Sequence, residues 1–540
     1  MYGMKMRLVL VLLVASPLLA GTQERRVTLE GEVVDAESGK ALPCRLYVQG
    51  SNGRWHTVKS ASRDGSAVPH IKERLGVSEV HTTLSAHPFL TDLEPGEYVV
   101  AAEPGKEYFP AEQSVKLENT PVKVTLKLRR WIDMAKRGWY SGDTHVHRGL
   151  DELPNVVLAE DLNVSFPLLY WVTRAHVAPT RGDKSATGEA PARVISVDST
   201  HVIWPRNTEY EIFTVDEKRH ELGAFFVLGH RSKFNSGVPP VQWAAKQAHS
   251  EGGLIELDKH VWPWSMCIIP VMDVDLYELA NNHMWRAGFG FRDWGEPPPP
   301  YMKIERDDKG LTEWGWIDYG FKNYYALLNS GFRLRPTAGT ASGVHPVPLG
   351  FGRVYVKLDG EFSYDAWLRG LDEGRSFVTT GPMLLVEAGG KPPGHTFQSR
   401  ETDQIPVTIT AVSETPLERI ELVVNGAIQE TYTPQNNRTA RGAYESTIAE
   451  QVRAGASSSW VAARAIEKRP GGRVRFAHSS PIYIDIQGRP IRPRKEEVDF
   501  LIGRVRAQIS RSQGVVAPRA IAEYQKALTV YRDIAKHAER

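Results

Sequence analysis

The hydrophobic pattern changes its period along the 540 residues, and these changes are what most constrain the fold. Residues 27–130 alternate apolar and polar side chains between Gly and Pro turns, which favours the short strands of a β-sandwich. Residues 131–390 instead alternate strands with helices, and residues 391–488 return to strand alternation. Because a chain of this length exceeds what one hydrophobic core usually organises, we expect several structural units.

The first twenty residues have the pattern of a signal peptide. Lys5 and Arg7 precede an apolar run at 8–20, which is short for a membrane span but long enough for a signal-peptide core. Ala20 and Gly21 offer a small-residue cleavage site, and an uncleaved anchor is the alternative. We expect export to the periplasm or outside the cell, with no stable membrane span once residues 1–20 are removed.

Charge and cysteine content exclude two classes of function. The formal net charge is +2 and falls to zero without Lys5 and Arg7, so no global field would attract nucleic acid. Cys44 and Cys267 are the only cysteines, and this count excludes a Cys-based metal site. They fall in different expected units, so a disulfide between them is not favoured. The sequence gives no indication of an oligomeric state.

The central region predicts strands followed by helices. Residues 153–162 and 240–250 are predicted helices, and Asp318 is the predicted N-cap of a third helix that ends near Gly331. Apolar runs at 164–171, 224–228, 252–257 and 275–280 are predicted strands. This alternation implies a parallel sheet or barrel. Residues 494–540 predict a helical hairpin, with a break near Gly514 and Pro518.

Histidines follow the apolar runs where these strands should end. His145 and His147 are two residues apart, so on a strand both side chains point to one face and can chelate one ion. His230 and His260 each follow a predicted strand as well. In a barrel of parallel strands the functional groups gather at the C-terminal strand ends. The four histidines together predict a metal site.

Carboxylates and cations complete the predicted site. Glu209 or Glu211 supplies a carboxylate, and imidazoles with a carboxylate suit zinc, manganese or iron. Arg148, Arg231 and Lys259 each adjoin a candidate ligand and are candidates for stabilising a developing anion. An ion at this site would activate water for hydrolysis of a small-molecule or polymer-derived substrate.

The central region resembles the CehA/McbA family of metallohydrolases, within the PHP (polymerase and histidinol phosphatase) superfamily. The resemblance covers about 131–385 and rests on segments that include Gly142-Asp143-Thr144-His145-Val146-His147, Gly229-His230 and the residues leading to His260. It implies a distorted (β/α)7 barrel, flanked here by two β-sandwiches and the helical hairpin. It also implies hydrolysis of ester or phosphoester bonds. The metal ligands that it implies are His145, His147, Glu209, His230 and His260. Arg148 and Lys259 depart from the family pattern, and their predicted catalytic role rests on their position next to candidate ligands.

Two further features bear on this resemblance. Residues 27–130 resemble the carboxypeptidase regulatory-like (transthyretin-like) modules of exported proteins, which fits known family architectures. Where many superfamily members have an aspartate after the last barrel strand, this chain has Thr340-Ala341-Ser342-Gly343. Alanine and glycine side chains cannot ligate a metal, so we expect one or two ions rather than three.

The missing aspartate also motivates a second hypothesis, an exported protein with a degenerate barrel that binds a glycan or cell-surface polymer. Aromatic faces stack on sugars, and this chain has 14 Trp and 19 Tyr. Five of the tryptophans follow the predicted site in the sequence: Trp262, Trp264, Trp285, Trp314 and Trp316. Binding without turnover, in protein fully loaded with metal, would favour this hypothesis.

Overall fold

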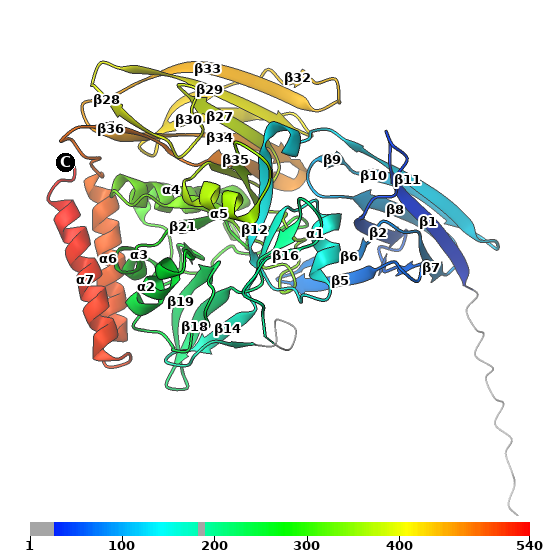
Figure 1. Cartoon of the computed structure of the whole chain (residues 1–540), viewed down its shortest axis with the longest axis horizontal. Helices are drawn as coiled ribbons and strands as arrows, with labels where there is room; N and C mark the ends of the chain where they lie inside the picture. The colour runs from blue at the N-terminus through cyan, green and yellow to red at the C-terminus, as the bar shows by residue number, and fades with distance from the viewer. Residues whose placement is uncertain (1–25, 182–188, 540) are drawn as a thin grey trace, which may run out of the picture.

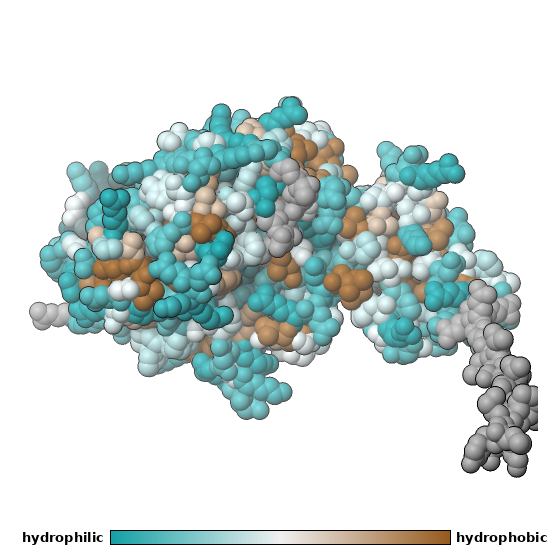
Figure 2. Space-filling model, turned by 90° about the horizontal axis from the view of Figure 1, so that it is seen from below, coloured by the Kyte–Doolittle hydropathy of each residue, from teal (hydrophilic) through white to brown (hydrophobic). Residues whose placement is uncertain are grey.

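A computed structural model describes residues 26–181 and 189–539 of the chain. Figure 1 shows the N-terminal strands at one end of the molecule and the long helices α6 (Lys495–Ser512) and α7 (Pro518–Ala535) at the other. The predicted signal peptide lies outside the described residues. Within the described ranges, no helix is long and apolar enough to cross a membrane. Figure 2 shows a face on which hydrophobic residues form small separate patches among hydrophilic ones.

Residues 27–130 form two sheets around one core. Along β1 (Val27–Asp35), Leu29 and Val33 are buried while Glu30 between them is exposed, and they share a core with Leu46 and Val48 of β2. The period of two in the sequence is therefore the period of burial. The sheets have the orders β4-β7-β1-β11-β9 and β10-β8-β2-β6-β5, with β3 beside β2. The remaining bounds are β2 Cys44–Gly50, β3 Trp55–His56, β4 Lys59–Ser60, β5 Ala67–Arg74, β6 Val77–Leu84, β7 Phe89–Leu93, β8 Gly96–Glu103, β9 Tyr108–Phe109, β10 Ala111–Leu117 and β11 Val122–Arg130.

Residues 139–379 contribute to two sheets whose side chains meet in a shared interior. Thr144 of β12 donates a hydrogen bond to Glu256 of β20 over 2.8 Å, which joins the two sheets across this interior. The seven-stranded sheet has the order β15-β14-β18-β19-β20-β21-β24. Its bounds are β14 Tyr170–Arg174, β15 Thr180–Arg181, β18 Thr208–Val215, β19 Lys218–Leu228, β20 Leu254–Leu257, β21 Leu276–Ala280 and β24 Arg335–Ala338.

The prediction of a parallel sheet is wrong for β19, which runs antiparallel to both β18 and β20. A two-residue hairpin turn joins β18 to β19, and both turn residues, Asp216 and Glu217, have positive φ angles of 46° and 64°. Such turns usually carry Asn-Gly or Asp-Gly. Asp216-Glu217 lacks the glycine, so the sequence does not predict this turn. The seven-stranded sheet is therefore mixed, whereas a (β/α)7 barrel requires parallel strands.

The second sheet continues from the central region into the C-terminal strands. Residues 377–379 of β26 pair with residues 477–479 of β35, so the backbone ladder crosses the boundary predicted near 390. This twelve-stranded sheet has the order β16-β17-β13-β12-β25-β26-β35-β34-β30-β31, with β36 beside β34 and β28 beside β36. Its bounds are β12 Trp139–Val146, β13 Val164–Pro167, β16 Ile195–Ser196, β17 Val202–Ile203, β25 Arg353–Lys357, β26 Ser376–Thr379, β28 Thr396–Ser399, β30 Arg419–Val424, β31 Ala427–Tyr432, β34 Ser459–Arg469, β35 Arg473–Ser479 and β36 Ile482–Ile486.

A four-stranded sheet, β27-β29-β33-β32, shares a core with the C-terminal strands of the twelve-stranded sheet. Ile409 and Ala411 of this smaller sheet contribute to that core together with Ile420 and Leu422. The C-terminal strands therefore form a second two-sheet layer, which Figure 1 shows along one side of the molecule. The bounds are β27 Met383–Ala388, β29 Gln404–Ser413, β32 Asn437–Arg438 and β33 Tyr444–Arg453, with a separate hairpin of β22 Arg306–Asp307 and β23 Gly310–Leu311.

Helices cover the central sheets. The third predicted helix exists but begins earlier than expected, because Thr312 rather than Asp318 is its N-cap and accepts a hydrogen bond from the Gly315 amide over 2.9 Å. Asp318 lies within this helix and pairs with Lys322. Helices α3 and α5 are not among those the sequence predicts. The bounds are α1 Leu153–Ala159, α2 Gln242–Ser250, α3 Ser265–Met272, α4 Glu313–Asn329 and α5 Tyr364–Asp372, with 3-10 turns η1 Ala135–Arg137, η2 Pro300–Met302 and η3 Pro470–Gly472.

The C-terminal helices dock on the seven-stranded side of the molecule. Tyr531 of α7 donates a hydrogen bond to the Met266 carbonyl of α3, and Arg504 of α6 donates to the Trp262 carbonyl. The hairpin predicted for residues 494–540 therefore packs on the segment that follows β20. Cys44 and Cys267 are buried and free, in different parts of the fold.

Glu107 joins the N-terminal strands to the central region. Its carboxylate accepts hydrogen bonds from Arg130 (2.7 Å), the Met134 amide (3.0 Å) and the Tyr355 hydroxyl (3.1 Å). Burial, with Asp161 nearby, raises the pKa of Glu107 from 4.5 to about 7. As the pH rises through this range, the unfolded chain releases a proton that the folded protein keeps, so stability falls.

We therefore expect the contribution of Glu107 to the free energy of unfolding to drop by about 1–3 kcal/mol between pH 5 and pH 7. Glu107→Gln mimics the protonated carboxyl and should remove this part of the pH dependence. Urea unfolding of both proteins at the two pH values measures the difference. An identical pH dependence in the two proteins would contradict this assignment.

Candidate metal centre

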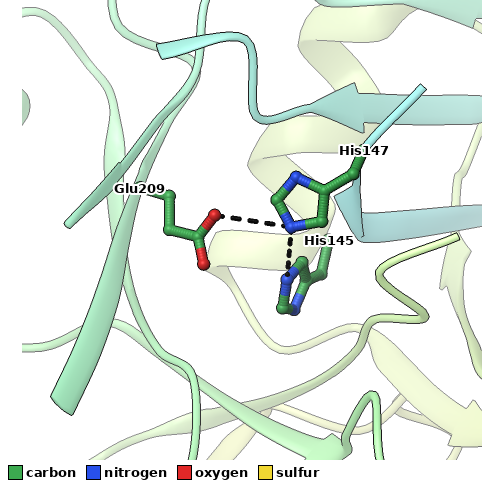
Figure 3. A group of neighbouring side chains, drawn as sticks. All are labelled: His145, His147 and Glu209. Atoms are coloured by element: carbon green, nitrogen blue, oxygen red, sulfur yellow. Dashed lines mark hydrogen bonds and ion pairs between the residues drawn. The ribbon is translucent and has the colours of Figure 1, made fainter. Parts of the chain in front are cut away.

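Three side chains from two sheets meet in the shared interior. His145 Nε2 lies 3.1 Å from His147 Nε2, which in turn lies 3.4 Å from a carboxylate oxygen of Glu209. Figure 3 shows the three side chains pointing toward one another. Two N–H groups cannot face each other at this distance, so at most one of the two Nε2 atoms carries a proton. We call His145, His147 and Glu209 the first donor group.

The backbone explains why these three meet. His145 and His147 stand two residues apart at the end of β12, so their side chains share a face as the sequence predicts. Glu209 stands near the start of β18, paired with Phe226 of β19, and the Phe226 ring packs 4.4 Å from the His145 ring. Glu209 rather than Glu211 is the carboxylate that reaches the histidines; Glu211 accepts a hydrogen bond from Trp171 instead.

A second donor group contacts the other nitrogen of His145. Its Nδ1 lies 3.1 Å from Glu278 and 3.8 Å from Asp258, and the ligand atoms of these three residues all lie within 4.8 Å of one another. Asp258 follows β20 and Glu278 is in β21, which are parallel neighbours, so both carboxylates come to one edge of the sheet. His145 therefore stands between two groups of metal-type ligands.

The interior around these groups carries an excess of buried acid. Burial, with Asp258 and Glu256 nearby, raises the pKa of Glu278 well above its usual value. Burial likewise raises the pKa of Glu256 to about 8, against the hydrogen bonds that it accepts from Thr144 and Thr337. Carboxylates that repel one another in this way hold protons at neutral pH unless a cation compensates their charge.

A divalent cation fits this arrangement by both distance and charge. Two ligands that share one zinc ion at about 2.0–2.1 Å in a tetrahedron are roughly 3.4 Å apart. The observed separations of 3.1 and 3.4 Å in the first donor group are close to that value. The imidazole and carboxylate donors are those that zinc, manganese or iron prefer. Among the described residues the two donor groups offer five candidate ligands.

Two of the histidines that the family resemblance implies as ligands lie outside both donor groups. The nitrogens of His230 bond to the Thr208 hydroxyl (2.9 Å) and the Ser232 carbonyl (2.7 Å), and burial lowers its pKa to about 4. Since β19 is antiparallel to β20, its carboxyl end lies at the edge opposite to Asp258. The same end of β19 lies beside the start of β18, near Glu209, but there the Nε2 of His230 bonds to Thr208.

His260 is buried among the rings of Tyr277, Trp316 and Tyr319. Burial, with Arg504 and Lys259 nearby, lowers its pKa to about 3, so the ring is neutral. Within the described ranges neither of its nitrogens has a hydrogen-bond partner. Among the described residues, His260 belongs to no group of three such ligand atoms within 4.8 Å of one another.

The two predicted catalytic cations occupy different places. Lys259 forms a buried ion pair with Asp258 and therefore touches the second donor group. Arg148 turns away to other partners: Ser342, Glu152 and, over 2.7 Å, His70 of the N-terminal sheet. Its guanidinium joins the N-terminal strands to the segment that carries His147. Arg231, the third candidate, is exposed.

Sequence reasoning missed the carboxylates of the second donor group and its neighbours. Glu256 and Glu278 each interrupt an otherwise apolar strand, in Leu254–Leu257 and Leu276–Ala280. An acid at an inward position of such a strand is costly to bury without a partner. That signal, together with Asp258 one residue after β20, could have found them.

The segment that replaces the expected aspartate holds the histidine pair in place. The Ala341 amide donates to the His145 carbonyl and the His147 amide donates to the Ser342 carbonyl, over 2.6 and 2.9 Å. Thr340 donates through its hydroxyl (2.5 Å) and amide (3.2 Å) to buried Asp143, which also accepts from the His145 amide. Burial raises the pKa of Asp143 to about 6, so these donors are what keep it charged near neutral pH.

Thr340→Val removes the hydroxyl donor while keeping the side-chain volume. We expect the free energy of unfolding to fall by about 1–3 kcal/mol, because Asp143 loses a partner in a buried place. Urea unfolding measures this loss. Thr340→Ser keeps the hydroxyl and should lose clearly less; equal losses in the two variants would rule out the hydrogen bond as the cause.

The tryptophans that motivated the polymer-binding hypothesis do not form an open stacking surface. Trp262, Trp264, Trp285 and Trp316 are buried, and only Trp314 is partly exposed. Trp262 and the neighbouring Trp294 pack edge to face at 4.7 Å, with the Lys259 ammonium within 6 Å of both rings. These rings therefore pack beside Lys259, next to the second donor group.

Comparisons with known proteins assign no family to the chain. No protein-family model matches it, and neither does any curated protein. It is similar to a solved two-domain protein of Bacteroides vulgatus that contains a predicted PHP-like metal-dependent phosphoesterase. The identity is 12% and the TM-score 0.29, over 60% of this chain and 90% of that chain. A likeness this distant assigns neither fold nor function.

Proposed function

We propose that the chain is a metal-dependent hydrolase that acts on an ester or phosphoester bond, in the manner of the CehA/McbA and PHP proteins that its sequence resembles. The observation that supports this most is the convergence of His145, His147, Glu209, Asp258 and Glu278 in one buried place. The proposal includes export, as the pattern of residues 1–20 predicts.

The two donor groups would hold one or two metal ions. His145, His147 and Glu209 would hold one divalent transition-metal ion, and His145 with Asp258 and Glu278 would hold either the same ion or a second one. The chemistry that such an ion supplies is to lower the pKa of water toward 7 and to polarise the oxygen under attack. The chain itself fixes the ligands, because every one of these side chains is buried.

Other residues would set the charge of the site. Burial raises the pKa of Glu256 to about 8, so without a cation in the site this carboxyl holds a proton at neutral pH. Lys259 forms an ion pair with Asp258 of the second donor group, and its ammonium lies near two Trp rings. It is placed to stabilise a developing anion beside that group.

Metal content and an activity panel test the proposal. The chain from residue 26 onward should bind a divalent transition metal and hydrolyse at least one substrate from a panel of phosphomonoesters, phosphodiesters and carboxylic esters. Chelation should remove the activity, and metal addition should restore it. A metal-free protein that stays inactive after incubation with zinc, manganese and iron would reject the proposal, as would turnover unaffected by chelation.

A further inference from the structure

A cavity of about 300 Å³ lies where the N-terminal strands, the central region and the C-terminal strands meet. Seven of the residues that line it are Arg or Lys, and three are Glu. No residue of either donor group lines it. Its contents are therefore a question separate from the metal centre.

Four of the seven cations have a carboxylate oxygen within about 3 Å, and a fifth, Arg475, has one at 3.7 Å. The partners are the three acidic residues of the lining and three more that do not line the cavity. The pairs are Arg45 with Glu103 and Glu160, Arg286 with Glu79 and Glu103, Arg469 with Glu467 and Glu414, and Arg473 with Glu313.

The other three cations, Lys106, Arg353 and Arg475, bond to backbone carbonyls. Lys106 Nζ donates to the Thr380 carbonyl over 2.8 Å, and Arg353 donates to the Gly350 carbonyl over 2.6 Å. Arg475 donates to two carbonyls, at 2.9 and 3.0 Å. A carbonyl satisfies a hydrogen bond but does not neutralise a full charge.

Carboxylates do not make up this difference among the described residues. In residues 26–181 and 189–539, no carboxylate oxygen lies within 4.0 Å of Lys106 or Arg353. The nearest to Arg475, from Glu313, is 3.7 Å away and already bonded to Arg473. The Lys106 ammonium and the Arg475 guanidinium lie 4.4 and 4.9 Å from the centre of one ring, Phe351. These two cations therefore lie beside the same ring of the cavity lining.

The protein bears an electrostatic cost for this arrangement. Burial, with Arg353 and Arg475 nearby, holds the pKa of Lys106 well below its usual value. Burial also lowers the pKa of Arg475 to about 10. Buried like charges without counter-charges are unfavourable, and a ligand of opposite charge relieves that cost when it binds.

We propose that this cavity is a binding site for a compact multivalent oxyanion, a phosphate or the phosphoryl group of a small phosphomonoester, held by Lys106, Arg353 and Arg475. Guanidinium and ammonium groups are the usual partners of phosphoryl oxygens. The cavity volume admits a phosphoryl group with a small organic substituent.

One residue connects this site to the metal centre. The Gly350 carbonyl accepts from Arg353, and the Gly350 amide donates over 2.9 Å to Asp143, which holds the backbone of His145. An anion on Arg353 therefore acts two hydrogen bonds away from Asp143.

Thermal unfolding with added anions tests the proposal. Inorganic phosphate should raise the Tm of the wild-type chain by about 2–4 °C relative to chloride at matched ionic strength. Glycerol 3-phosphate, compared in a parallel series, tells whether the organic substituent adds to or removes the effect. Wild-type protein that phosphate and glycerol 3-phosphate stabilise no more than chloride does would overturn the proposal.

Two variants locate the effect. Lys106→Met should abolish the phosphate-dependent shift and raise the Tm in phosphate-free buffer, because it removes an unbalanced buried cation. Arg475→Met should also abolish the shift, and it serves as the second variant if the first does not fold. Lys127→Met, an exposed lysine of the same N-terminal unit, should keep the full shift.

A third variant separates this cavity from the metal centre, where phosphate could also bind. The shift should persist in His147→Ala. A shift that is lost in His147→Ala and kept in Lys106→Met and Arg475→Met would assign the phosphate to the metal centre and overturn the proposal. The readout needs no turnover, so it is independent of whether the proposed hydrolase activity is found.

Discussion

His147→Ala is expected to lose the metal ion of the first donor group and to lower kcat/KM by about 10³-fold, since it removes one of the three donors of that group. His147 Nε2 is the atom that lies between His145 and Glu209, at 3.1 and 3.4 Å. Without it the first donor group keeps only His145 and Glu209, which are too few to hold an ion of their own. Elemental analysis and steady-state kinetics on the best substrate of the panel measure the two effects.

The matched control is His220→Ala, which changes a partly buried histidine of β19 that bonds to Ser512. It should keep both metal and activity. If His147→Ala kept wild-type metal content and turnover, the first donor group would not be the site.

Gly339→Ala is expected to be nearly as damaging, although it removes no donor atom. A Cβ at this position would come within 2.3 Å of the His145 Cβ and 2.8 Å of a Glu278 carboxylate oxygen. Both side chains must then move, and a displacement of ligands by this much disorganises both donor groups. We expect metal affinity to fall by about 10–100-fold and kcat/KM with it, as for lost ligand support in other metal sites.

Gly360→Ala is the control, because a Cβ there meets nothing within 4 Å. It should behave as wild type in a competitive metal-binding titration. Unchanged metal affinity in Gly339→Ala would show that His145 and Glu278 are not joint ligands.

The sequence was sufficient for the parts of the site that depend on local geometry. The two-residue spacing of His145 and His147 survives in β12 because strand periodicity is a property of the backbone itself. The prediction for Glu209 depended on the family resemblance, and the structure places that carboxylate beside His147. Amphipathic spacing likewise predicted the C-terminal helices, and the break expected near Gly514 and Pro518 falls at 513–517.

The rest depended on chain direction, which hydrophobic spacing does not encode. His230 follows an apolar run just as His260 does, yet a hairpin turn at Asp216 and Glu217 reverses its strand. Whether two strand ends meet is decided by such turns. Asp258 and Glu278 became candidates only when the parallel pairing of β20 and β21 was known.

The pairing of β26 with β35 has a consequence for biosynthesis. The ribosome adds about 5–20 residues per second, and β35 is translated about 100 residues after β26. One edge of β26 therefore stays unpaired for roughly 5–20 s. Throughout that interval the nascent chain presents unsatisfied amide and carbonyl groups, which other polypeptides can capture. Capture of this edge by another chain before residues 473–479 are made would lower the yield of folded protein in recombinant expression.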